Sequence, residues 1–72
     1  MNSITEQYRN QTLWQLEATR TQPTKENALQ LVLQAGYLRG AIQTAPLRRA
    51  EWYECNELII QAMNLAEPIL MK

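Results

Sequence analysis

Three prolines, at positions 23, 46 and 68, divide the 72-residue chain into three long proline-free segments followed by a short tail. A proline inside a helix removes one backbone hydrogen bond and clashes with the preceding turn, so helices tend to end near these positions. Each segment is long enough for about six helical turns. The sequence therefore predicts an all-α fold, with helices over residues 3–20, 25–44 and 48–67.

The middle segment is apolar around more than half of its helical circumference. A helix of this kind is covered by neighbours on two sides, so we expect it to be the central helix of the structure. Thr24 is placed to cap its first turn. Pro46 restricts Ala45 to an extended conformation, which predicts that the helix ends near Thr44 and that a short turn follows.

The last segment has one broad apolar face that includes Trp52 and Cys55, with glutamates and amides opposite. We expect this helix to end at Pro68. The short turn before it predicts an antiparallel hairpin between residues 25–44 and 48–67.

The first segment differs because its apolar residues occupy at least two sides of the helix. We expect one side to pack on the hairpin and the other to face a second subunit or a target. Tyr8 and Trp14 are the predicted protein-binding anchors, since large aromatic rings gain most from desolvation. Whether this helix packs on its own hairpin or on another chain stays open at this point.

A chain of this length forms a single small domain, residues 1–72, with marginal stability. Small domains are usually stabilised by disulfides, a metal or a partner chain. Cys55 is the only cysteine, and there is no histidine or aspartate, so neither a disulfide nor a zinc site is expected. No cofactor is predicted. The remaining possibility is association, and we expect a dimer or higher oligomer.

The charge balance also narrows the classes of partner. Seven basic and seven acidic residues cancel, whereas nucleic-acid-binding domains usually carry a basic surplus. Nucleic acid is therefore not favoured, although a dimer that presents Arg39, Arg48 and Arg49 from both chains remains an alternative. No apolar run approaches the roughly 18 residues that span a bilayer, so no membrane partner and a cytoplasmic location are expected.

Catalysis is not expected from this sequence. Cys55 lies on an apolar face with no histidine available to generate its thiolate. Glu51, Glu54 and Glu57 fall on the polar side of the last helix, whereas general acid–base catalysis needs a carboxylate with a raised pKa in a pocket. The sequence thus predicts a protein that is not an enzyme.

Two glycines lie four residues apart in the middle segment, Gly36 and Gly40. Each weakens a helix by about 1 kcal/mol relative to alanine, so close backbone packing should compensate. We expect them at the crossing with the hairpin's own second helix. The alternative is a groove that admits a helix from a partner.

The hairpin's second helix begins with a pair of arginines, Arg48 and Arg49, which oppose the helix macrodipole. Their expected role is a solvated turn, with an acidic partner or a phosphate as the alternative. Tyr53 and Ile60 form a narrow second stripe on this helix. We expect that stripe to be covered either by the first segment or by another subunit.

The phrases "AGYLRGAI" and "AEWYECNELI", separated by a polar turn with a proline, resemble the small helical hairpins of phage- and plasmid-encoded accessory proteins. That resemblance implies a small protein that binds a host protein and modulates it. It assigns no site residues. A non-enzymatic protein-binding module is the predicted function, with a structural or chaperone-like assembly subunit as the alternative.

Overall fold

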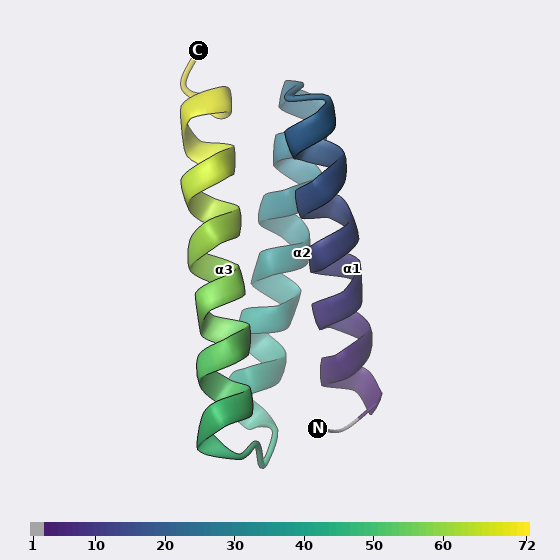
Figure 1. Ribbon diagram of the computed structural model, residues 1–72, viewed down its shortest axis with the longest axis vertical. Coiled ribbons are helices and arrows are strands. Elements are labelled where there is room, and N and C mark those ends of the chain that lie inside the picture. The colour runs from purple at the N-terminus through teal and green to yellow at the C-terminus, as the bar shows by residue number, and fades with distance from the viewer. Residues whose placement is uncertain (1–2) are drawn as a thin grey trace.

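The computed structural model describes residues 3–72, which form three α-helices in an up-down-up bundle (Figure 1). The helices are α1 (Ser3–Thr21), α2 (Lys25–Thr44) and α3 (Arg49–Leu70). All three pack against one another in a rod of 37 × 17 × 16 Å. The predicted all-α fold and the antiparallel hairpin of the second and third helices are confirmed, and α1 packs on the hairpin of its own chain.

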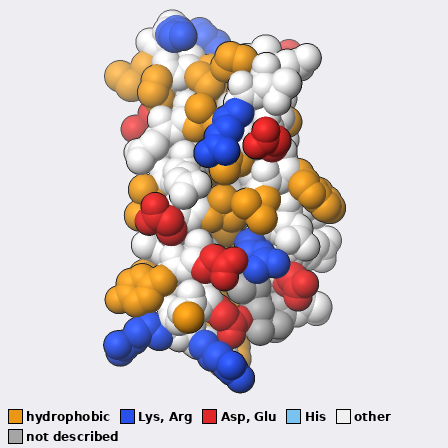
Figure 2. All heavy atoms as spheres, in the orientation of Figure 1, with side chains coloured by type: hydrophobic (Ala, Val, Ile, Leu, Met, Phe, Trp, Pro, Cys, Tyr) orange, Lys and Arg blue, Asp and Glu red, His pale blue; other side chains and the backbone are white. Residues whose placement is uncertain are grey.

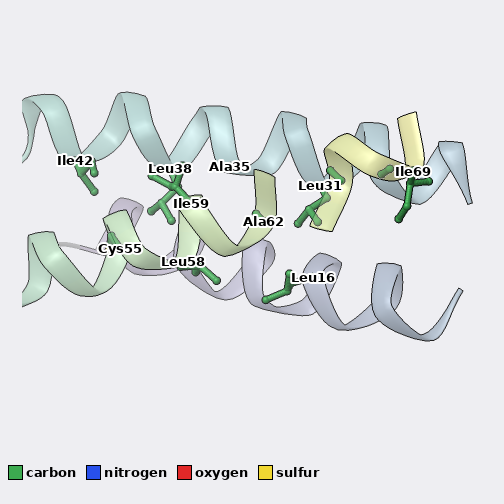
Figure 3. Packing of buried hydrophobic residues seen from close by; sticks show 12 residues of the cluster. Leu16, Leu31, Ala35, Leu38, Ile42, Cys55, Leu58, Ile59, Ala62 and Ile69 are labelled. Atoms are coloured by element: carbon green, nitrogen blue, oxygen red, sulfur yellow. The ribbon is translucent and has the colours of Figure 1, made fainter. Parts of the chain in front are cut away.

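The hydrophobic core runs along the contact between α2 and α3. Core residues of α2 alternate in steps of three and four, the spacing that keeps one stripe facing a neighbouring helix, and those of α3 follow the same pattern with Leu58 and Ile59 adjacent. The members that Figure 3 labels point into the space between the helices. The core residues of the hairpin are Ala28, Leu31, Ala35, Leu38 and Ile42 from α2, and Cys55, Leu58, Ile59, Ala62, Ala66 and Ile69 from α3. The apolar patterns of these two segments therefore lead directly to the core.

Helix α1 packs on the hairpin of α2 and α3 along a stripe of threonines. Thr5, Thr12 and Thr19 are buried and recur every seven residues, so they lie on one stripe of α1 that faces the hairpin. Leu16 is the only large apolar residue of α1 in the described core. This threonine seam explains why the apolar residues of the first segment show no clean stripe.

Hydrogen bonds from the threonine seam reach the backbone of α2. The Thr12 hydroxyl lies 2.8 Å from the carbonyl oxygen of Tyr8 in its own helix and 3.2 Å from that of Gln34 in α2. The Thr19 hydroxyl lies 3.2 Å from the carbonyl oxygen of Asn27. Since each hydroxyl finds an acceptor within its own helix or in α2, burying it carries little desolvation penalty.

The helix ends follow the predicted signals, with one exception. The Thr24 side chain accepts a hydrogen bond from the Asn27 backbone N–H at 3.1 Å, and Ala45 is extended after Thr44. The expectation that α3 ends at Pro68 is wrong, because the helix continues to Leu70. Proline lacks one N–H only, and burying Ile69 against the core offsets that single loss.

Trp52 does not join the core as expected. It remains 38% exposed at the start of α3, where its ring meets that of Tyr53 edge to face with centroids 5.4 Å apart. Helical geometry turns neighbouring residues by about 100°, so Trp52 lies at the rim of the apolar face of α3. The core of α3 begins one turn later, at Cys55.

Leu31 and Leu29 of α2 provide a matched test of this packing. Leu31 is fully buried, whereas Leu29 is 54% exposed on the opposite side of the same helix. We expect Leu31→Ala to lower the free energy of unfolding by about 2–5 kcal/mol. Leu29→Ala should lower it by less than about 1 kcal/mol. Urea denaturation followed by circular dichroism measures both, and equal losses would contradict this arrangement of α2.

Candidate protein-binding surface

Three large apolar side chains of α1 lie outside the core, among polar ones. Trp14 is 72% exposed, and Ile4 and Leu13 are also exposed. Since the threonine seam occupies the inward side, these side chains have no place in the core. Among residues 3–72, Trp14 is the most exposed aromatic residue.

Shallow hollows flank the Trp14 indole on both sides along α1. Polar side chains dominate the one toward the N-terminal end, which is lined by Ser3, Glu6, Gln7, Asn10, Gln11 and Trp14. The other is lined by Trp14, Glu17, Ala18, Thr21 and Gln22. A raised aromatic ring between amide and carboxylate groups matches the composition of protein interfaces, in which an apolar centre has a polar rim.

Tyr8 and Trp14, the two predicted anchors, are separated by the structure. Tyr8 is half-buried against the core, and its ring lies 5.8 Å from that of Tyr37 on α2. Tyr8 thus takes part in holding α1 to α2. Trp14 projects to solvent on another side of α1, so the two rings do not form one surface.

A groove between α1 and α3 adjoins the outward side of α1. It is lined by Arg9, Leu13, Glu54, Glu57, Leu58 and Gln61. Arg9 donates from Nη1 to Oε1 of Glu54 at 3.2 Å, which links the two helices. Figure 2 shows this side of the molecule, where acidic and basic groups are interspersed with apolar ones. Among the described residues on the face that Figure 2 shows, there is no single-sign patch of the kind that binds nucleic acid.

The sites predicted on α3 are exposed but lie apart from Trp14. Tyr53 is 60% exposed and Ile60 is also exposed. The first segment, α1, therefore does not cover this stripe, and the expectation that it would is wrong. Arg48 and Arg49 are exposed at the start of α3. Cover of the Tyr53 stripe by another subunit stays a prediction.

Gly36 and Gly40 face outward on α2, contrary to our main expectation. Among residues 3–72, no atom lies within 4 Å of a Cβ built at either glycine. The buried stripe of α2 runs through Ala35 and Leu38 instead. Packing within the chain therefore gives no reason for the glycines, and the alternative of a groove for a partner helix stays a prediction.

The seven-residue repeat of Thr5, Thr12 and Thr19 is the signal that sequence reasoning missed. Apolar periodicity does not include threonine, so it gives no inward stripe on the first segment. A buried threonine can donate to a backbone carbonyl, as Thr12 and Thr19 do here. Recognising the repeat would have assigned the seam to the inward side and Trp14 to the outward side.

The described part of the chain offers little for cofactor or membrane chemistry. Among residues 3–72 there is no group of three or more metal-ligating side chains, and no helix is long and apolar enough to cross a membrane. Cys55 is fully buried. Burial raises the pKa of its thiol, and the neighbouring carboxylate of Glu54 raises the pKa further.

Comparison with known proteins finds no family model, no curated protein and no solved structure that matches the chain. A functional proposal for this three-helix bundle therefore depends on its own surface.

The raised pKa of Cys55 predicts a pH dependence of stability. The thiol stays neutral in the folded state at pH values where it ionises in the unfolded chain, so its contribution is complete below about pH 8.5 and declines above that pH. The difference in unfolding free energy between the wild type and Cys55→Ala should therefore shrink between pH 8 and pH 10, by at most about 1.4 kcal/mol per pH unit. Urea denaturation at each pH measures the two unfolding free energies. A difference between wild type and Cys55→Ala that stays constant from pH 8 to pH 10 would contradict the raised pKa of the Cys55 thiol.

Proposed function

We propose that this protein is a non-enzymatic module that binds another protein through the outward side of α1, with Trp14 as the central anchor. The observation that carries this proposal is the reversed distribution on α1, which buries threonines and exposes its tryptophan. Folding alone would favour the opposite arrangement, because burying a large aromatic ring stabilises a small domain more than burying a threonine.

The surroundings of Trp14 support a protein partner. The flanking hollows are shallow and follow the helix, whereas sites for small molecules are usually deep and enclosed. Leu13 extends the apolar area toward the groove with α3, and Arg9 and Glu54 place a charged pair in that groove. A partner helix lying along α1 would meet an aromatic anchor with a polar rim. Modulation of a host protein, the role implied by the accessory-protein resemblance, is one use of such a module.

Truncation of the anchor tests this proposal. Trp14→Ala should reduce capture of the specific partner by at least about tenfold, since central aromatic anchors dominate interface energetics. Because Trp14 is exposed, the variant should keep the wild-type circular dichroism spectrum and melting temperature. The measurement is affinity capture from lysate of the source cells, with quantitative mass spectrometry of the retained proteins.

Tyr53→Ala is the matched control, because it truncates an exposed aromatic residue on the outward side of α3. It should retain the same proteins as the wild type. Equal retention by wild type and Trp14→Ala would contradict the proposal. Loss only with Tyr53→Ala would move the binding surface to α3.

A further inference from the structure

The outward face of α2 has a repeat of its own that lies outside the hydrophobic core of the described residues. Leu29, Leu33, Gly36 and Gly40 follow at intervals of four, three and four residues, the spacing of a coiled-coil seam. All four are exposed, with Leu29 at 54% and Leu33 at 48%. Two half-exposed leucines are thus followed, on the same stripe, by two positions without side chains.

This stripe is complementary to itself when two copies run antiparallel. A two-fold axis level with the peptide bond after residue 34 places Leu33 opposite Gly36 of the partner subunit. The same axis places Leu29 opposite Gly40 of the partner subunit, so every leucine meets a glycine. Self-complementarity about a two-fold axis is the defining property of a symmetric dimer interface.

We infer that α2 pairs with α2 of a second copy of this chain, in an antiparallel dimer with alternating leucine and glycine layers. Open space above both glycines gives the leucines of the partner subunit room to enter without displacing atoms of residues 3–72. The inference uses α2 alone, so it is independent of the proposed role of Trp14 on α1.

The helix macrodipole of α2 favours the antiparallel direction. Residues 27–38 contain no charged side chain, while Lys25 and Glu26 lie before them and Arg39 after them. Antiparallel pairing brings both Glu26 and Lys25 to within about 8 Å, along the helix axis, of the level of Arg39 of the partner subunit, so attraction and repulsion are balanced at each end. Parallel pairing would place like charges opposite each other, and its helix macrodipoles would also be aligned unfavourably.

The size of the face sets the expected strength of the dimer. Between Glu26 and Thr44 the helix is about 27 Å long, so its face covers less than the roughly 800 Å² per partner of a standard stable interface. A reversible dimer with a dissociation constant in about the micromolar range is expected. Sedimentation equilibrium over a range of concentrations should show a monomer–dimer equilibrium.

Two variants test the register. Gly36→Leu puts a leucine opposite Leu33 of the partner subunit and should raise the dissociation constant at least about tenfold. It should not lower the melting temperature of the dilute monomer, because the position is open and leucine favours the helix. Combining Leu33→Gly with Gly36→Leu restores one leucine and one glycine per layer, so dimerisation should recover.

Tyr53→Ala, on α3, is the control and should leave the dissociation constant unchanged. A protein that stays monomeric up to about 1 mM would overturn the inference. So would an unchanged dissociation constant in Gly36→Leu. Failure of the double variant to recover dimerisation would overturn the proposed register, and loss of the dimer in Trp14→Ala alone would place the interface on α1.

Discussion

The contact between α1 and α2 determines what the rest of the surface presents. Thr12 and Thr19 place their hydroxyls against carbonyl oxygens of α2, and the small side chains let the two backbones come close. This seam uses the only side of α1 that faces the hairpin. Leu16 joins the core, whereas Trp14, Ile4 and Leu13 of α1 are left on the outside. The polar seam is therefore the reason that Trp14 lies on the surface.

The central helix links this outward surface to the opposite side of the molecule. Its inward stripe, from Ala28 to Ile42, holds both neighbours, and its outward stripe holds Leu29, Leu33 and the two glycines. Apolar residues around more than half of the helix thus serve two purposes. One stripe makes the fold, and the other is the stripe that we propose pairs with a second copy of the chain.

The hairpin could be predicted from the sequence because its signals are local and strong. Thr24 and Pro46 define the ends of α2, and apolar periodicity selects the inward side of α3. Three features could not be predicted in the same way. The helix continues past Pro68 because Ile69 gains burial, the glycines face outward because the buried stripe of α2 runs through Ala35 on another side of the helix, and the inward side of α1 carries threonines.

The candidate site was predicted in part. The sequence identified the aromatic residues of α1, but only the position of the threonine seam separates their roles. Tyr8 lies near that seam and stacks on Tyr37, while Trp14 is turned away from it. Helical periodicity alone placed these rings on different sides without saying which side faced the core.

Nuclear Overhauser effects on the isotopically labelled protein test the threonine seam most directly. The account predicts contacts from the methyl groups of Thr12 and Thr19 to α2, near Gln34 and Asn27 respectively. It also predicts that the Trp14 indole shows contacts only to residues of α1. Contacts from the indole to core residues such as Leu31, together with none from the threonine methyls to α2, would contradict it.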